Sequence, residues 1–149
     1  MIDAIDKQII NIIQSDFPIT GRPYQVIAEH LGLDESGVIR RIKSLKENGI
    51  IRRIGGNFSP GRLGYVSTLC AAKVPTDAIA AFTRVVNTYP GVTHNYERDH
   101  AYNIWFTFIA PSMEIIQRHL MDISQTTGVT DILNLPATHL FKLNAQFTL

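Results

Sequence analysis

Residues 92–110 read VTHNYERDHAYNIWFTFIA, and this stretch decides the fold of the C-terminal part of the chain. It contains two segments of β-forming residues, 92–98 and 101–110, with almost no connector between them. We therefore expect an antiparallel hairpin that turns near Asp99. Side chains alternate along each strand. The predicted faces are His94, Tyr96 and Arg98 on the first strand, and Tyr102, Ile104, Phe106 and Phe108 on the second, opposite Asn103, Trp105 and Thr107.

The hairpin concentrates side chains that suit a large, planar, metal-containing ligand with carboxylates. Residues 94–106 hold two histidines, an arginine, two tyrosines and a tryptophan. One predicted face, from His94 to Arg98, spans about 14 Å at the usual rise per residue, which is comparable to the width of a tetrapyrrole. Ordinary explanations also exist: a strand histidine bonded to its neighbour, an exposed histidine at a turn, and aromatic rings that pack a sheet.

The segments around the hairpin complete a ferredoxin-like order. A strand is expected over 65–74, and a helix over 77–88 that Tyr89-Pro90-Gly91 ends. After the hairpin, Ser112 caps a second helix that Gly128 ends. Extended segments are expected over 129–149, interrupted by Pro136. The order βαββαβ predicts a ferredoxin-like domain over residues 61–149.

The N-terminal part predicts three helices and a wing. Apolar residues at helical spacing indicate a helix over 2–13, Pro23 opens a second helix, and Asp34 caps a third. Residues 50–54 are expected to form a short strand that begins the wing. Residues 1–60 are therefore predicted to be a winged helix-turn-helix domain, which gives the chain an α+β fold.

Composition narrows the functional classes. The chain of 149 residues carries 14 basic and 13 acidic side chains, of which residues 1–60 hold 8 and 7. This balance argues against DNA binding by the third helix, because operator recognition usually rests on a basic excess. No apolar run is long enough for a membrane span and no secretory signal is recognisable, so we expect a cytoplasmic protein without a membrane partner. The single Cys70 excludes an intramolecular disulfide.

The chain resembles a known family along its whole length. The stretch from Ile27 to Leu33 and the stretch from Leu45 to Ile51 resemble the leucine-responsive regulator family, also called the AsnC family. Those regulators carry a Gly and an Asp in the hairpin loop, where small amino acids bind between subunits, whereas this chain has residues 98–103, RDHAYN. The hairpin, over 94–107, is more similar to siroheme decarboxylase subunits, which share the regulator architecture.

The resemblance implies a carboxy-lyase. Siroheme decarboxylases remove carbon dioxide from two acetate side chains of siroheme and give didecarboxysiroheme, in the alternative haem or haem d1 pathway. Losing carbon dioxide leaves carbanion character on the ring-attached carbon, so a positioned proton donor is needed. The candidate catalytic residues are His94, Tyr96 and His100.

The same resemblance implies how the substrate would be held. Arginines suit the other carboxylates, aromatic rings suit the macrocycle, and one histidine suits the iron. The candidate substrate-binding residues are Arg52, Arg53, Arg98, Tyr102, Asn103 and Trp105. The candidate iron ligand is His94. No cofactor separate from the siroheme or haem-type tetrapyrrole is expected.

Two other functions remain open at this point. One is a DNA-binding regulator of the leucine-responsive type, in a form that senses haem. The other is a tetrapyrrole-binding subunit that supports a catalytic partner. Family members often consist of two homologous, unequal subunits, so the resemblance implies a heterodimer or a homo-oligomer.

Overall fold

A computed structural model of the chain describes residues 2–56, 58–142, 147 and 149. These residues form two compact units. The first contains residues 2–56 together with the described residues from Lys142 onward, and the second contains residues 58–141. The division into domains 1–60 and 61–149 stays a prediction; by compactness, the described residues from Lys142 onward group with the first unit.

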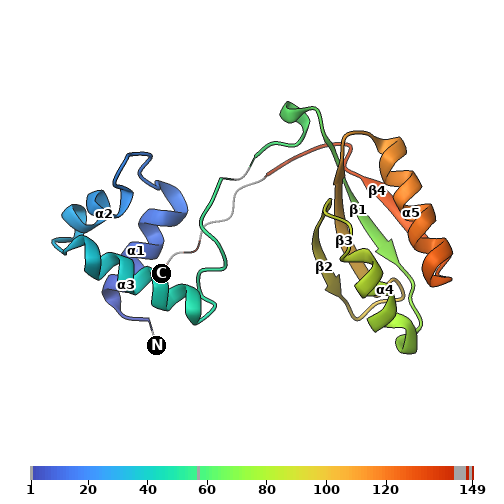
Figure 1. Cartoon of the computed structure of the whole chain (residues 1–149), viewed down its shortest axis with the longest axis horizontal. Helices are drawn as coiled ribbons and strands as arrows, with labels where there is room; N and C mark the ends of the chain where they lie inside the picture. Colours follow the sequence, from blue (N-terminus) through green and yellow to red (C-terminus); the bar gives the residue numbers. More distant parts are fainter. Residues whose placement is uncertain (1, 57, 143–146, 148) are drawn as a thin grey trace. The chain divides into compact units, whose positions relative to one another are not determined.

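Three helices make up the N-terminal unit (Figure 1). They are α1 (Ala4–Ser15), α2 (Pro23–Leu31) and α3 (Glu35–Glu47). Asp3 and Asp6 form a capping box at the start of α1, and the Asp34 carboxylate accepts from the Gly37 N–H at the start of α3. Gly32 ends α2 at a φ of 66°, a conformation that favours glycine. The predicted three helices are confirmed.

The predicted wing strand over 50–54 is wrong, because residues 50–56, all of which the structure describes, form no strand. Their backbone is used differently. The Ile50 and Ile51 N–H groups both donate to the Leu45 carbonyl, at 2.9 and 3.1 Å, and the Ile51 side chain is buried against the helical core. The segment therefore packs on the end of α3 instead of pairing as a strand.

Phe147, near the end of the chain, is hydrogen-bonded to α1. Its N–H donates to Gln14 Oε1 at 3.0 Å, and its carbonyl accepts from Gln14 Nε2 at 2.7 Å. One side-chain amide thus satisfies both backbone groups of a residue far away in the sequence. This pair explains why the end of the chain belongs to the N-terminal unit.

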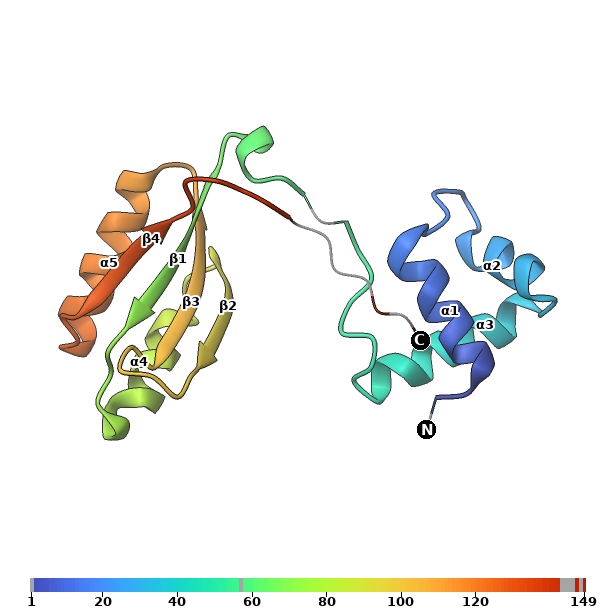
Figure 2. The ribbon, with the colours of Figure 1, turned by 180° about the vertical axis from the view of Figure 1, so that it is seen from behind.

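In its described residues, the second unit is a four-stranded antiparallel sheet with two α-helices and two short 3-10 helices. The strands are β1 (Val66–Ala72), β2 (Val92–Glu97), β3 (Ile104–Ala110) and β4 (Ile132–Pro136). The helices are η1 (Gly61–Leu63), η2 (Thr76–Ala78), α4 (Ile79–Val86) and α5 (Met113–Thr127). The strands lie in the order β2-β3-β1-β4, as Figure 2 shows. The predicted ferredoxin-like arrangement is confirmed.

One face of this sheet is buried under both α4 and α5. Phe82 of α4 and Ile116 of α5 pack with Cys70, Phe106 and Phe108 of the sheet in one core. Along β3, buried and half-buried residues alternate, as expected when one face of a strand is covered. The other face carries the half-buried side chains of β3 and is where the candidate residues of β2 lie.

The hairpin differs from its prediction at the turn. Strand β2 ends at Glu97 and β3 begins at Ile104, so residues 98–103 form a connector closed by an Arg98 N–H bond to the Asn103 carbonyl at 2.7 Å. Tyr102 and Asn103 therefore do not belong to the returning strand. Their side chains form hydrogen bonds with Asp131 and Val74, outside the hairpin, instead of extending strand β3.

Candidate functional site

The open face of the sheet brings His94, Tyr96 and Trp105 together. His94 pairs with Thr107 and Tyr96 pairs with Trp105 across the β2–β3 ladder. The His94 and Tyr96 rings stack with centroids 6.1 Å apart and planes 25° apart. The predicted shared face of His94 and Tyr96 is thus confirmed, and both side chains are exposed. These rings form an aromatic surface against which a planar ligand can pack.

Arg98 lies beside this surface. Its guanidinium carbon is 5.7 Å from the centre of the Trp105 ring, within the range of a cation–π contact. The indole N–H of Trp105 donates to the Tyr102 carbonyl at 2.6 Å, which fixes the ring against the hairpin connector. A permanent cation is therefore held at the edge of the aromatic surface, where it can bind a carboxylate.

A β-bulge lies next to His94. The register shifts between Val92, opposite Phe108, and His94, opposite Thr107. The Thr93 hydroxyl lies 3.0 Å from His94 Nδ1. A bulge changes the direction of nearby side chains, and here it brings the successive side chains of Thr93 and His94 into contact. Because Nδ1 contacts Thr93, Nε2 is the nitrogen of His94 that remains available to a ligand.

His100 lies in the connector, and its ring is held in a different way. Nδ1 of His100 accepts the backbone N–H of Tyr102 at 3.1 Å. An N–H group can only donate, so Nδ1 carries a lone pair and the proton of the neutral ring is on Nε2. The His100 and Tyr102 rings also stack, with centroids 6.4 Å apart. The geometry presents His100 Nε2–H as a donor.

Tyr102 is anchored by a residue far along the chain. Its hydroxyl donates to Asp131 Oδ1 at 2.9 Å, and this bond to a carboxylate raises the pKa of the Tyr102 phenol. Asp131 is itself tied to the sheet, since its carbonyl accepts the Lys73 N–H at 3.0 Å. Tyr102 is therefore fixed at its hydroxyl and, through its carbonyl, by Trp105.

Asn103 uses its side-chain amide to hold the connector, and its part in substrate binding stays a prediction. Its Oδ1 accepts the Val74 N–H and its Nδ2 donates to the Val74 carbonyl, both at 2.9 Å. Both ends of the side-chain amide are used on one backbone residue. The arrangement favours a structural part, in which Asn103 clamps the connector to the end of β1.

A hollow of about 530 Å³ opens at the same end of the hairpin. Arg98, His100 and Asn103 line it, together with residues that the sequence did not single out. These additional residues are Thr76, Ile79, Glu97 and Asp99. Arg98 belongs both to this hollow and to the edge of the aromatic surface. The site therefore joins an aromatic part to a polar recess.

Arg52 and Arg53 lie in the N-terminal unit, whereas the other seven predicted site residues lie in the second unit. Both arginines are exposed in the extended segment after α3. Their part in binding stays a prediction.

Sequence reasoning missed Thr93 and Asp131. The adjacency of Thr93 to His94 was visible, but an alternating strand places neighbours on opposite faces, and only the bulge overturns that. Asp131 lies 29 positions beyond Tyr102. An acidic residue just before the last strand is a weak signal, because charged residues are common at strand ends.

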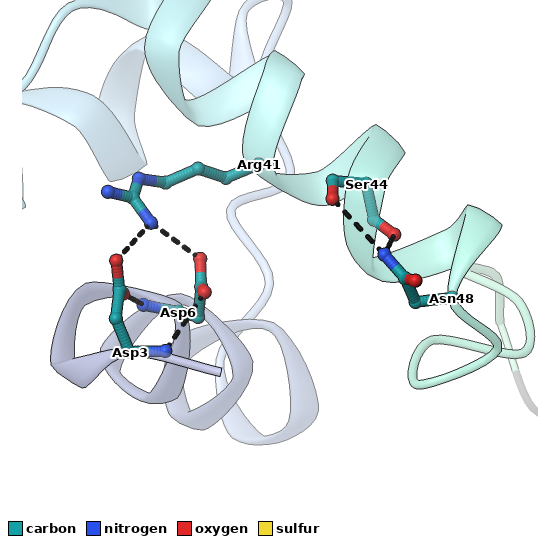
Figure 3. A network of polar contacts seen from close by, with 5 residues as sticks. All are labelled: Asp3, Asp6, Arg41, Ser44 and Asn48. Carbon is teal, nitrogen blue, oxygen red and sulfur yellow. Dashed lines mark hydrogen bonds and ion pairs between the residues drawn. The ribbon is translucent and has the colours of Figure 1, made fainter. Parts of the chain in front are cut away.

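The third helix of the N-terminal unit does not present its cations freely. Figure 3 shows Arg41 reaching back to α1, where it bonds to Asp3 at 2.7 Å and Asp6 at 2.8 Å. Lys43 lies 3.9 Å from Glu47 on the same helix. Two of the four cations of this helix are thus paired with carboxylates. The geometry agrees with the weak DNA signal of the sequence.

Within the residues that the structure describes, no three His, Cys, Asp or Glu side chains gather in a way that could hold a metal ion. None of the helices in the described part of the chain has the length and apolar character needed to cross a membrane.

Two family models match the chain. The model of the AsnC-like ligand binding domain matches residues 62–142, and that of the siroheme decarboxylase NirDL-like HTH domain matches residues 6–52. A siroheme decarboxylase alpha subunit of Desulfovibrio desulfuricans is 55% identical over 97% of this chain and 83% of its own length. The siroheme decarboxylase NirD subunit of Stutzerimonas stutzeri is 36% identical over 99% of this chain and 96% of its own length.

Solved structures agree with the sequence relatives. The siroheme decarboxylase NirDL, crystallised in co-complex with an iron-uroporphyrin III analogue, matches with a TM-score of 0.66 and 34% identity. The match covers 97% of this chain but only 48% of that one, so the chain spans about half the length of NirDL. Together with the two domain matches, these similarities show that the chain belongs to the siroheme decarboxylase family.

Proposed function

We propose that this chain is a catalytic subunit of a siroheme decarboxylase, which removes the carboxylates of two acetate side chains. The observation that supports this most is the hairpin site, where one hairpin carries an aromatic surface, an arginine held against Trp105 and two histidines whose Nδ1 atoms are engaged, leaving Nε2 available. The NirDL complex with an iron-uroporphyrin III analogue supports a tetrapyrrole as the ligand of this family.

The reaction needs no oxidant and no separate cofactor. In each round the bond between the acetate methylene and its carboxylate breaks, carbon dioxide leaves, and the electron pair stays on the methylene carbon. One proton added to that carbon gives a methyl group. The protein must therefore remove the carboxylate from water and supply one proton at the reacting carbon.

His100 is the proposed proton donor. Its Nδ1 accepts the Tyr102 N–H, so the transferable proton lies on Nε2, at the wall of the polar hollow. Giving up this proton leaves the His100 ring as an imidazolate, which takes one proton from solvent before the second round. Tyr96, on the open face, is the second proposed donor, in keeping with its exposed hydroxyl position beside His94.

His94 is the proposed ligand of the substrate's iron. Nε2 is available while Thr93 engages Nδ1, which is the usual arrangement of a metal-binding imidazole with an oriented second nitrogen. Tyr96 and Trp105 would lie against the macrocycle. Arg98 is assigned to a carboxylate that does not react, because an arginine paired with the reacting carboxylate would stabilise the ground state. Arg52 and Arg53 are proposed to bind further carboxylates.

A homologous second subunit is proposed as the partner. NirDL is about twice as long as the part that this chain matches, and the closer relatives are named as subunits. We propose that the hollow of about 530 Å³ and the exposed aromatic face contact only one side of a bound macrocycle. A second chain would cover that side and exclude water from the reacting carboxylate.

Paired histidine variants test this division of work. We expect His100→Gln to bind siroheme anaerobically like the wild type, with the same visible spectrum, and to lose at least about tenfold in turnover. We expect His94→Ala to change the visible spectrum of bound siroheme, since the iron loses a ligand. Full turnover by His100→Gln would contradict the assignment of the proton donor. An unchanged spectrum in His94→Ala would contradict the assignment of the iron ligand.

A further inference from the structure

Asp131 is connected to the hairpin site through a chain of hydrogen bonds. Its carboxylate accepts the Tyr102 hydroxyl at 2.9 Å, and the Tyr102 N–H in turn donates to His100 Nδ1 at 3.1 Å. The Tyr102 ring stacks on the His100 ring with their planes 23° apart. Asp131 itself does not line the hollow. Any effect that it has on the reaction must therefore pass through Tyr102.

The hydrogen bond between Tyr102 and Asp131 contributes little to the stability of the fold. The bond itself is exposed, with Asp131 exposed and Tyr102 half-buried, so water replaces it at small cost when it is lost. The connector has other fastenings, since Asn103 already clamps it to Val74. A fixed Tyr102 side chain has a more specific consequence, because it fixes the direction in which the Tyr102 N–H points.

That direction decides which nitrogen of His100 carries the proton. The two neutral tautomers of histidine have similar free energies in water, so one directed N–H donor is enough to select between them. If the Tyr102 N–H moves away from His100, Nδ1 can take the proton, and Nε2 then presents a lone pair to the substrate. A lone pair at that place cannot protonate the carbanion.

We propose that Asp131 is a positioning residue that holds Tyr102, and through it keeps His100 in the form with the proton on Nε2. This inference rests on the proposed function for its effect on turnover. It does not rest on that function for the tautomer, which can be measured in the chain without substrate. Nothing in the sequence around Asp131 marks it as part of the site.

Nitrogen NMR of the full-length chain tests the tautomer directly. Histidine labelled with ¹⁵N gives separate signals for Nδ1 and Nε2, and His100→Gln identifies those of His100. We expect the wild type to show the Nε2–H form. Tyr102→Phe removes only the hydroxyl, and Asp131→Ala removes its acceptor, so both should shift His100 toward a mixture of tautomers. Asp131→Asn keeps an oxygen that can accept and should remain like the wild type.

Turnover with siroheme gives the second measurement. We expect Tyr102→Phe and Asp131→Ala each to lower kcat by about three- to tenfold with KM unchanged, and Asp131→Asn to restore most of it. The double variant should be no worse than either single variant, because both break the same bond. Melting temperatures should stay close to that of the wild type.

The outcomes separate the two proposals. A wild-type tautomer signal in Tyr102→Phe and Asp131→Ala would overturn the positioning role, whatever the activity. Additive losses in the double variant would overturn it as well. The expected NMR shifts in a chain that never decarboxylates siroheme would uphold the positioning role and contradict the proposed function instead.

Discussion

His94 and His100 lie six positions apart, yet different kinds of neighbour hold their rings. A hydroxyl, which can donate or accept, faces His94, whereas a backbone N–H, which can only donate, faces His100. The sequence placed both histidines among the candidates but did not distinguish them. The distinction depends on a bulge and on the path of the connector, and neither follows from residue types alone.

Cys70 illustrates a residue whose chemistry is fixed by burial. Its side chain is fully buried in the core under α4 and α5, and desolvation raises the pKa of the thiol to about 12. We expect no reaction with a thiol reagent at pH 8 in the native chain, and complete reaction after unfolding in denaturant. Rapid modification at native conditions would show that the core around β1 opens.

The sign of this shift also predicts a dependence on alkaline pH. The unfolded thiol ionises near its usual pKa of about 9, while the folded thiol stays protonated. Its contribution to stability is therefore complete below about pH 9 and is lost as the pH rises toward 12. Cys70→Ala should flatten this part of the stability curve, measured by denaturant unfolding.

At the scale of elements, the sequence predicted what local chemistry decides. The starts of α1, α3 and α5 follow from their capping residues Asp3, Asp34 and Ser112, and glycines end α2 and α5. The predicted wing strand is absent because the Ile51 side chain packs in the helical core and its N–H donates to the Leu45 carbonyl. These are tertiary contacts, which the local sequence does not reveal. The connector between β2 and β3 is longer than the sequence predicts, because it is held by hydrogen bonds to Val74 and Asp131, outside the hairpin.

Gly91 is the residue on which the start of the hairpin depends. A Cβ placed there would lie 2.2 Å from the Ile109 carbonyl oxygen and 3.0 Å from the Phe108 ring. The backbone must shift to accept it, and Gly91 also accepts the Ile109 N–H at 2.9 Å. We expect Gly91→Ala to lower the free energy of unfolding by about 1–3 kcal/mol, as overpacking usually does.

The matched control for this variant is Gly61→Ala. An added Cβ at Gly61 meets no atom within 4 Å, and this glycine lies in the same unit. Urea unfolding of both variants should therefore show a loss at position 91 alone. Equal effects at the two positions would mean that glycine flexibility, and not the close approach of β3, matters at Gly91.

At the scale of the whole molecule, the N-terminal unit has the helix-turn-helix fold, and Arg41 of its third helix is paired with Asp3 and Asp6. The Asp3 carboxylate accepts the Asp6 N–H, and it also accepts from Arg41; these bonds hold the pKa of Asp3 below its usual value. Its stabilising effect is present above the unfolded pKa of about 3.9 and is lost as the pH falls through the lower folded value.

This predicts a change in acid unfolding. Asp3→Asn should lower stability at neutral pH and make the remaining loss below about pH 4 less steep, as followed by circular dichroism during an acid titration. Asp77→Asn, which makes the same charge change in the other unit, is the control. Parallel acid curves for wild type and Asp3→Asn would contradict the role given to this network.

The central claim is that the hairpin site decarboxylates siroheme. The measurement that tests it most directly is anaerobic incubation of siroheme with this chain, alone and with its homologous partner subunit, followed by mass spectrometry of the tetrapyrrole. The account predicts two successive losses of the mass of carbon dioxide, abolished or slowed at least about tenfold by His100→Gln. An unchanged tetrapyrrole mass in both mixtures, together with salt-sensitive binding of the chain to a defined DNA duplex, would contradict it in favour of a regulator.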